Sequence, residues 1–385
     1  MKQARKILFL IPLLFFACKK DQNEEMHSIN KQNGLLANRF AHLKIEKIEP
    51  VTFNYGKGSL KEALNSRKLS TLTYLRDSTW ENVFGRSAFY ESDEMVVTPS
   101  NRSYVYPGSI LKASSIASDE FQTFFGFERA PITAQLSFPS SLSYGTIENP
   151  TLSNSRIFLR NAIMSPDFSG KQIDDFTQNI SYFSRYEEVK LAYGYNVNEK
   201  RLFSSTNASF DYNSTGKQYS TKLVASYMVK NFTYSMSDPV DGQLIDMSTI
   251  TPEVFEGISP VYINSVTYGR LGILVVETDN NSSQMKSAFE KVVKKIFKQT
   301  NESFTQEQTV LFNSCRVTIY ILGSTMGEST IQLLINPSPE SVSSFLSENV
   351  GVFTAQDPGV PISFTAKYLK DNSRFKTVFR LDFPN

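Results

Sequence analysis

The stretch that decides the fold is "VYINSVTYGRLGILVVETDNNSSQMKSAFEKVVKKIF", residues 261–297. Its first half belongs to the stretch 259–278, which is rich in β-branched and aromatic residues and predicts a long strand that ends in a polar turn. In its second half, apolar residues recur three and four positions apart with lysine and glutamate between them, which predicts an amphipathic helix. The apolar positions of this helix are Met285, Ala288, Phe289, Val292, Val293, Ile296 and Phe297. We therefore expect a strand followed by a helix with one buried stripe.

The composition of the chain is that of an ordinary globular protein. It has 385 residues, of which 40% are hydrophobic and 20% are charged, and this length suits one large domain or two to three modest ones. The formal net charge is +2, so no strong field indicates nucleic acid or an acidic substrate as a partner. The many tyrosine, phenylalanine, valine and threonine residues favour strands, which predicts a β-rich α+β fold.

The sequence lacks the residue constellations of an enzyme. Its two histidines, His27 and His42, both lie within the first fifty residues, where a serine–histidine or cysteine–histidine pair would be hard to build. No zinc, calcium or phosphate-loop motif occurs in the sequence. We therefore expect neither an enzymatic activity nor a cofactor or metal.

The N-terminus has the pattern of an export signal. A basic stretch, "MKQARK", precedes the apolar stretch 7–17, which is too short to span a bilayer and ends at Cys18. This pattern is similar to a bacterial lipoprotein signal, with lipid on Cys18 and a polar tether over 18–40; an ordinary secretory signal is the alternative. We expect export and lipid anchoring at the outer membrane or cell surface. Cys315 is then left without a partner and is expected to be a buried, inert thiol.

Four blocks, in order along residues 95–375, resemble the cholesterol-dependent cytolysins, also called thiol-activated cytolysins. They are "RSYVYPGSILKA" (102–113), "APITAQLSFP" (130–139), the strand and helix of 261–294, and "DPGVPISFTAKYLKDNS" (357–373). The resemblance implies an α+β fold with a bent antiparallel core sheet of four strands, flanked by two helical clusters. It also implies a pore-forming protein that associates into a ring on a target membrane.

In that family, two helical segments of the soluble monomer become transmembrane β-hairpins. By position, the resemblance assigns the first hairpin to residues of about 186–214 and the second to about 284–307. The first has residues that alternate as a barrel strand requires: Leu191, Tyr193, Tyr195 and Val197, and after a polar turn Leu202, Ala208, Phe210 and Tyr212. The second would comprise the apolar helix positions named above. It alternates poorly as a strand, because Lys291 and Lys295 share the odd positions with Phe289 and Val293.

The resemblance also indicates residues for protomer pairing and for the release of an edge strand. These are Tyr186, Tyr268, Gly269, Arg270, Gly323, Ser324 and Gly327. Relatives have a glycine pair where the edge strand breaks, whereas here Ser324 follows Gly323 and Gly327 is the next glycine. An aromatic residue that pairs with the matched Tyr186 in relatives falls at Val317, so protomer pairing must rely on other contacts.

The sequence departs from the family at its end, where a tryptophan-rich, cholesterol-binding domain is expected. Trp80 is the only tryptophan. We therefore expect a short form: residues 1–17 as signal, 18–40 as tether and 41–385 as the core. In that core, domains 1 and 3 interleave, parts of about 41–95 and 372–385 form an elongated domain 2, and domain 4 is absent.

Two functions remain open from the sequence. One is a pore-forming protein that acts with a longer cytolysin-like partner in a two-component system. The other is a non-lytic surface lipoprotein that uses the same sheet as an adhesion or binding module. Lys291 and Lys295 lie on a face that should meet lipid, and these charges favour the binding module.

Overall fold

The computed structural model describes most of the core of the chain. The described ranges are 40, 42–54, 72–81, 84–118, 120–168, 170, 175–182, 219–240, 243–246, 250, 252–298, 303–324, 329–350 and 352–384. All structural statements below concern these ranges.

The larger of two sheets is built around β10 (Val261–Thr278), an antiparallel strand of 18 residues. Its main strand order is β12 (Ser329–Ile335), β11 (Cys315–Leu322), β10, β9 (Thr221–Met236), β6 (Ile132–Leu136) and β7 (Tyr144–Ile147). Four further strands pair beside this path: β8 (Asp175–Tyr182) with β9, β13 (Val360–Tyr368) and β5 (Ile110–Leu111) with β10, and β4 (Met95–Val96) with β13. The antiparallel run β8-β9-β10-β11 is the predicted four-stranded core sheet, and β12 extends it by one edge strand.

The sheet bends because its two long strands change partners along their length. The first half of β10 pairs with β13 and the second half pairs with β11. Its neighbour β9 pairs with β6 near Tyr234 and with β8 from Leu223 to Lys230. At the change, Tyr268 pairs with Phe232 but Gly269 pairs with Lys230, so Asn231 is an extra residue on β9. Such a bulge kinks its strand and increases its twist, which confirms the predicted bend.

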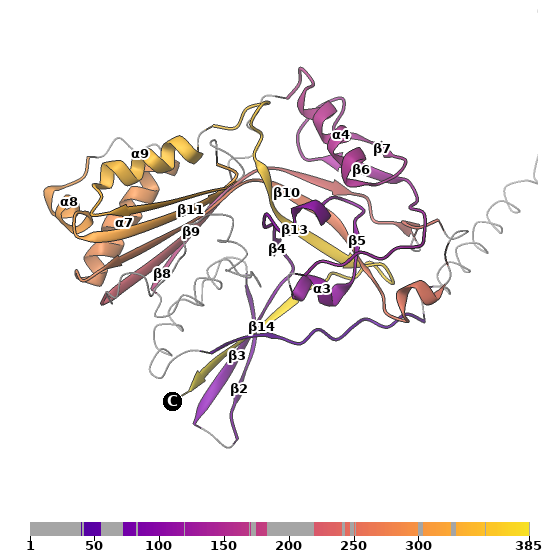
Figure 1. The fold of residues 1–385 in the computed structure, drawn as a ribbon, viewed down its shortest axis with the longest axis horizontal. Coiled ribbons are helices and arrows are strands. Elements are labelled where there is room, and N and C mark those ends of the chain that lie inside the picture. The colour runs from indigo at the N-terminus through magenta and orange to yellow at the C-terminus, as the bar shows by residue number, and fades with distance from the viewer. Residues whose placement is uncertain are drawn as a thin grey trace, which may run out of the picture.

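Three helices cover one face of the β8–β12 end of the sheet (Figure 1). They are α7 (Ser282–Lys298), α8 (Gln306–Phe312) and α9 (Pro339–Val350). A capping box begins α8, in which the Thr305 side chain accepts from the Gln308 backbone and the Gln308 side chain accepts from the Thr305 backbone. The second predicted helical cluster, about 186–214, lies outside the described residues. In the ranges that the structure describes, no helix is both long and apolar enough to span a bilayer.

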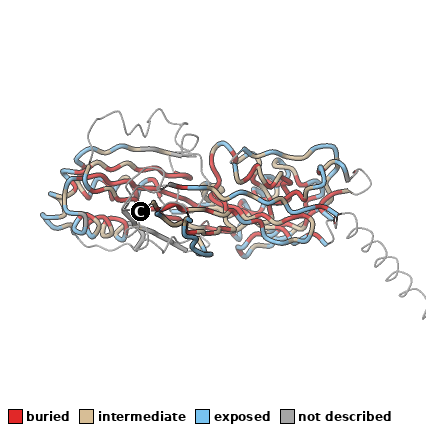
Figure 2. The backbone as a smooth tube through the Cα atoms, turned by 90° about the horizontal axis from the view of Figure 1, so that it is seen from below, coloured by how far each residue is buried: buried red, intermediate tan, exposed pale blue. Residues whose placement is uncertain are grey.

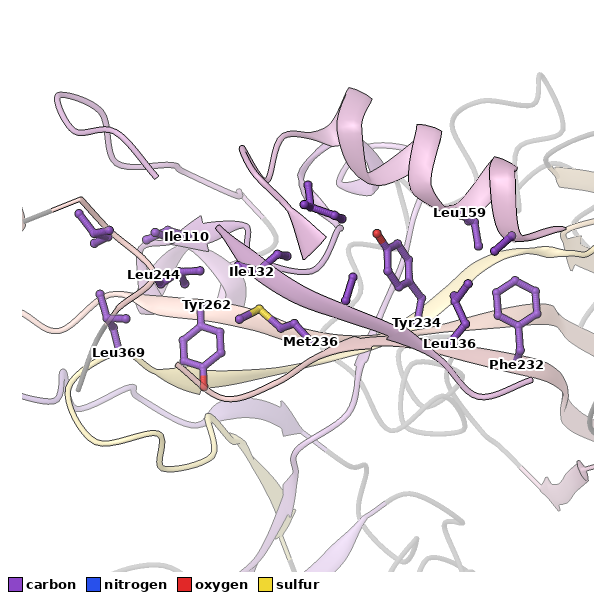
Figure 3. Close-up of a cluster of buried hydrophobic side chains, with 14 of the residues drawn as sticks. Ile110, Ile132, Leu136, Leu159, Phe232, Tyr234, Met236, Leu244, Tyr262 and Leu369 are labelled. Atoms are coloured by element: carbon purple, nitrogen blue, oxygen red, sulfur yellow. The ribbon is translucent and has the colours of Figure 1, made fainter. Parts of the chain in front are cut away.

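The other end of the large sheet has its own core beneath α4 (Leu152–Ile163). Figure 3 shows Leu159 of α4 above Tyr234, Leu136 and Phe232 of the sheet. The Tyr234 ring stacks on Phe158, with 14° between the ring planes, and its hydroxyl lies 2.9 Å from the Ser155 hydroxyl. Short elements complete this end: α3 (Ala113–Ala117) and the 3-10 turns Arg102–Tyr104 and Pro252–Phe255. In Figure 2, buried residues run along the strands, while exposed residues follow the outer loops and helix faces.

The smaller sheet brings strands from residues 51–92 next to a strand from residues 377–384. Its order is β1 (Val51–Asn54), β14 (Thr377–Pro384), β3 (Gly85–Ser92) and β2 (Thr73–Thr79), with β1 parallel to β14. Its apolar side is a small cluster that includes Phe53, Tyr90, Phe379 and Leu381. The β2–β3 hairpin projects away from the large sheet (Figure 1). These strands come from the residues assigned above to domain 2; the division of the chain into domains remains a prediction.

Phe232 is expected to be a main contributor to the stability of the bend. Its side chain is fully buried, with its ring centre 5.3 Å from that of Phe138 and 4.9 Å from that of Tyr268. Replacing it with alanine should lower the free energy of unfolding by about 3–5 kcal/mol, because it removes packing and leaves a cavity. Urea unfolding followed by far-ultraviolet circular dichroism measures this. The matched Phe125→Ala variant, at a side chain that is 81% exposed, should change it by about 0.5 kcal/mol or less. Equal losses of unfolding free energy in the two variants would contradict the expected contribution of Phe232 to stability.

Candidate functional site

The site that the sequence indicated lies where β10 enters α7, and α7 is a helix with one buried face. Met285, Ala288, Phe289, Val292 and Val293 are each at most 1% exposed. Ile296 and Phe297 belong to the same helix, but their side chains lie outside the described residues. The lysines between them are on the outer side. With a helical period the apolar and charged residues separate onto two faces, whereas with a strand period they mix.

The buried face of α7 packs on the middle of the sheet and against α9. The cluster that holds it together contains side chains from β9, β10, β11, α8 and α9: Leu223, Ala225, Tyr227, Leu274, Val276, Phe312, Cys315, Val317, Ile319, Ile321, Val342, Leu346 and Val350. Val317 therefore points into the α7 interface and is fully buried. Cys315 is a buried, free thiol, as predicted, and burial raises its pKa to about 12, so it stays protonated and inert.

The charged side of α7 rests on Phe304, at the beginning of the segment that leads into α8. The Lys291 ammonium donates a hydrogen bond of 2.8 Å to the Ser303 carbonyl. The ammonium groups of Lys291 and Lys295 lie 5.8 and 4.8 Å from the centre of the Phe304 ring. These are cation–π contacts at the surface, each worth about 0.5–1 kcal/mol. In this fold the two lysines are thus placed away from the apolar stripe.

The chain between β10 and β11 starts and ends at paired residues. Thr278, the last residue of β10, is opposite Cys315, the first of β11, and 36 residues lie between them. Tyr182, the last residue of β8, is likewise opposite Leu223 of β9. Both intervening segments, 183–220 and 279–314, therefore connect neighbouring antiparallel strands and leave the sheet at the same end.

Hydrogen bonds connect the bases of these two segments. The Ser220 amide donates to the Asp279 carboxylate at 3.1 Å, and the Thr221 hydroxyl donates to the Asn280 carbonyl at 3.0 Å. At the next residue pair of the β10–β11 ladder, Arg316 donates a hydrogen bond of 2.6 Å to the buried Glu277. The guanidinium carbon of Arg316 lies 5.6 Å from the centre of the Tyr219 ring. A displacement at the base of one segment must therefore disturb the base of the other.

At the bend, the buried side chain of Arg270 joins three parts of the chain. Its Nε donates to the Gly323 carbonyl at 2.8 Å, and one of its terminal nitrogens donates to Asp357 at 2.6 Å. Its guanidinium carbon lies 4.5 Å from the centre of the Phe353 ring. Burial lowers the pKa of Arg270, and the negative charge of Asp357 opposes that shift, so the guanidinium stays charged. Arg270 thus ties the end of β11 and the loop before β13 to β10.

Glycines make this close approach possible. Gly323 has a φ of +78°, and a Cβ there would lie 2.9 Å from the Gly269 carbonyl oxygen. A Cβ on Gly269 would lie 2.1 Å from the Val229 carbonyl oxygen. The extra residue of β9, Asn231, donates from its side chain to the carbonyls of Gly170 at 2.9 Å and Pro358 at 3.0 Å. The backbone at the bend therefore tolerates no side chain at either glycine.

Of the other predicted residues, the structure describes Tyr268 and Ser324 and leaves the rest outside the described ranges. Tyr268 stacks on Phe232 with 10° between the ring planes, and burial raises its pKa to about 12. The Ser324 hydroxyl donates to the Asn349 side chain at 2.7 Å, which ties the chain after β11 to α9. Gly327, Tyr186, Cys18 and the first-hairpin residues 191–212 lie outside the described residues. Asp357, Phe353 and Asn231 were not singled out from the sequence; Asp357 begins the fourth family block, which was the one available signal.

Comparison with known proteins identifies the family. The family described as thiol-activated cytolysin matches residues 86–379, and the chain belongs to it. Pneumolysin of Streptococcus pneumoniae serotype 4 is 27% identical over 307 residues, which is 74% of this chain and 61% of pneumolysin. Tetanolysin of Clostridium tetani is 27% identical over 281 residues, which is 70% of this chain and 51% of tetanolysin. This chain thus spans less than two thirds of the length of these relatives.

The fold is that of solved cytolysins. The crystal structure of the human-specific toxin intermedilysin superimposes with a TM-score of 0.66 at 19% identity, covering 92% of this chain and 75% of intermedilysin. This confirms the predicted α+β fold with a bent core sheet. Membership of a cytolysin family also confirms the prediction that the chain is not an enzyme.

The ion pair between Arg270 and Asp357 is expected to stabilise the bend. Replacing Asp357 with asparagine leaves the buried guanidinium without a countercharge and should lower the free energy of unfolding by about 1–3 kcal/mol. The matched variant is Asp93→Asn, which removes the carboxylate that pairs with the exposed Arg374 and should cost about 1 kcal/mol or less. Chemical unfolding of the two variants in parallel measures the difference. A smaller loss for Asp357→Asn than for Asp93→Asn would show that Arg270 does not depend on this partner.

Proposed function

We propose that this chain is a pore-forming protein that associates edge to edge into a ring. In the ring, α7 and the segment of about 186–214 are rebuilt as transmembrane β-hairpins. The single observation that carries this proposal is the connection between strands: β8 with β9, and β10 with β11, are neighbouring antiparallel pairs whose connecting segments leave the sheet at the same end. Extending each pair produces two adjacent hairpins without any change of strand order.

The lengths of the segments suit a bilayer. The 36 residues between Thr278 and Cys315 provide two arms of about 18 residues each. A tilted transmembrane strand needs roughly 9–11 residues. The arms are therefore long enough to cross the bilayer and to leave a turn on the far side. Backbone groups in lipid must all be paired, so hairpins of neighbouring protomers have to insert together as a closed barrel.

Edge-to-edge association requires a free strand edge on β11. In the soluble fold β12 occupies that edge along seven residues, from Arg316–Ile335 to Leu322–Ser329. The chain reverses after β11 at Gly323, whose positive φ and contact with Arg270 define the point about which β12 would swing away. After release, β11 of one protomer can pair with β8 of the next. Val317 faces the α7 interface in the soluble fold, so it becomes available only once α7 has left.

The setting of this activity is a further part of the proposal. Family relationship and the export pattern support a protein that is carried to the bacterial surface on a lipid at Cys18. The expected partners are further copies of the chain, a longer cytolysin-like protein and a target membrane. No cofactor is involved. The rival function, a non-lytic binding module that keeps β12 and α7 in place, is the alternative outcome of the experiment below.

Locking β12 to β11 should abolish leakage. Thr318 and Leu333 are direct partners in the ladder, and antiparallel partners lie within the Cα distance of about 7 Å that a disulfide allows. We expect Thr318→Cys/Leu333→Cys, in a Cys315→Ala background, to bind vesicles but release no trapped dye when oxidised. Reduction should restore the release. Dye release should be measured with and without a longer cytolysin-like partner.

The matched control is Ser265→Cys/Thr365→Cys, which links β10 to β13, a pair that stays together in the proposal. Its oxidised form should leak as the reduced form does. Undiminished leakage from the oxidised β11–β12 variant would exclude release of β12. Absence of leakage from every form, with and without the partner, would favour the non-lytic binding module.

Lipid on Cys18 is expected from the basic and apolar stretches that precede it. Growth of the producing bacterium with a labelled fatty acid should mark the wild-type chain and leave Cys18→Ala unlabelled. The Cys315→Ala variant is the control and should be labelled normally, because that thiol is buried. Label on Cys18→Ala would refute lipid attachment at this residue.

A further inference from the structure

The turn between β2 and β3 presents aromatic side chains at the end of the projecting hairpin. The sequence between the two strands is "WENVFG", residues 80–85, of which the structure describes 80, 81, 84 and 85, and it contains the single tryptophan of the chain. Phe84 is 86% exposed, and Trp80, four residues earlier in the sequence, is half-buried. Figure 1 shows the hairpin extending away from the large sheet, with β14 ending alongside it. Large apolar side chains at such a protruding position indicate a contact surface.

Trp80 is held rigidly in this turn. Its amide donates to the Gly85 carbonyl at 3.1 Å and closes the loop, and its indole Nε1 donates to the Ser87 hydroxyl at 2.8 Å. A Cβ on Gly85 would lie 2.5 Å from the indole ring, so glycine is needed for the ring to lie there. The position of the indole is therefore set before any partner arrives, which lowers the entropic cost of binding.

The Ser87 hydroxyl is itself fixed from β14. It donates to the Asp382 carboxylate at 2.5 Å, and Arg380 donates to the same oxygen at 2.7 Å. Ser87 and Asp382 are both buried. This network connects Trp80 to two strands of the small sheet, β3 and β14, so the indole is held by the sheet.

The charges near the turn are balanced. Arg86 is paired with Asp77 at 3.4 Å, and Arg380 is paired with Asp382. Glu81 is the one charged residue in the stretch 80–84. The end of the hairpin therefore offers no cationic cluster to an acidic partner, and its attraction has to come from apolar contact.

We propose that Phe84 and Trp80 insert into the interfacial region of a lipid bilayer, with Phe84 entering the apolar layer and Trp80 at the level of the headgroups. Two aromatic side chains bury about 150–250 Å² each, which is well below the roughly 800 Å² per partner of a stable protein interface. A protruding turn with one tryptophan and one phenylalanine instead suits the membrane interface, where an amphipathic indole is favoured. The choice of a bilayer as the partner rests on the proposed pore-forming function.

The fluorescence of Trp80 can report its insertion directly, because no other tryptophan contributes to the emission of the chain. The full chain should be mixed with phosphatidylcholine vesicles with and without bromine on the acyl chains. We expect the emission to shift to the blue and to be quenched by the brominated lipid. A lipid on Cys18 does not imitate this result, because quenching requires the indole itself at the bilayer.

The matched variants are Phe84→Ser and Phe125→Ser, at two side chains that are 86% and 81% exposed. Loss of Phe84 should weaken partition of the turn into the bilayer about tenfold, whereas Phe125→Ser should leave it unchanged. Added salt should have no effect, because no charged cluster is involved. Both side chains are exposed, so unchanged circular dichroism should show that both variants fold.

Vesicle-bound protein without quenching of Trp80, or equal quenching in the two variants, would overturn the proposal. A blue shift that depends on protein concentration and not on brominated lipid would also overturn it, since a second copy would then cover the turn. Leakage without quenching would refute the inserted turn and leave the proposed pore intact. Quenching without leakage would support the turn and count against pore formation.

Discussion

The bend of the large sheet depends on one buried cation. Arg270 lies at the point where β10 exchanges β13 for β11 as its partner, and its guanidinium binds the carbonyl of Gly323 and the carboxylate of Asp357. A buried charge is tolerated only where hydrogen bonds and a countercharge compensate for the loss of water. The end of β11, the loop before β13 and the centre of β10 must therefore stay together. The glycines at 269 and 323 allow this, since neither position has room for a Cβ.

The bend separates two parts of the large sheet that are covered in different ways. On one side, α4 and the aromatic rings around Phe232 bury β6 and β9 in a dense core. On the other side, α7 covers the sheet with five apolar side chains among those that the structure describes, while its Lys291 and Lys295 lie over the Phe304 ring. The β-branched Val292 and Val293 lower its helix propensity by tenths of a kcal/mol each, roughly. Packing on the sheet, more than propensity, thus keeps this segment helical.

The long strand and its helix could be predicted from the sequence, because the strand is rich in β-branched and aromatic residues and the helix has a strong apolar period. The predicted strand 259–278 contains the observed β10, and five of the seven residues at helical spacing after it lie on the buried face of α7, while the side chains of Ile296 and Phe297 lie outside the described residues. The contacts of Arg270 could not be predicted, because its partner Asp357 is 87 residues away along the chain. The same is true of Asn231, whose role as the extra residue of β9 depends on a register that no local pattern specifies. Trp80 is distinctive in the sequence as the single tryptophan, but its support by Ser87 and Asp382 comes from strands nearly 300 residues apart.

The central claim is that α7 exchanges a helical for a strand conformation in the membrane. The most direct measurement is the accessibility to oxygen of spin labels placed singly at positions 286–295, before and after vesicles begin to leak. In the soluble protein the accessibility should vary with a period of 3.6 residues, following the buried face of α7. In leaking vesicles it should alternate with a period of two, as one side of each strand meets lipid and the other meets water. A period of 3.6 residues retained in leaking vesicles would contradict the account.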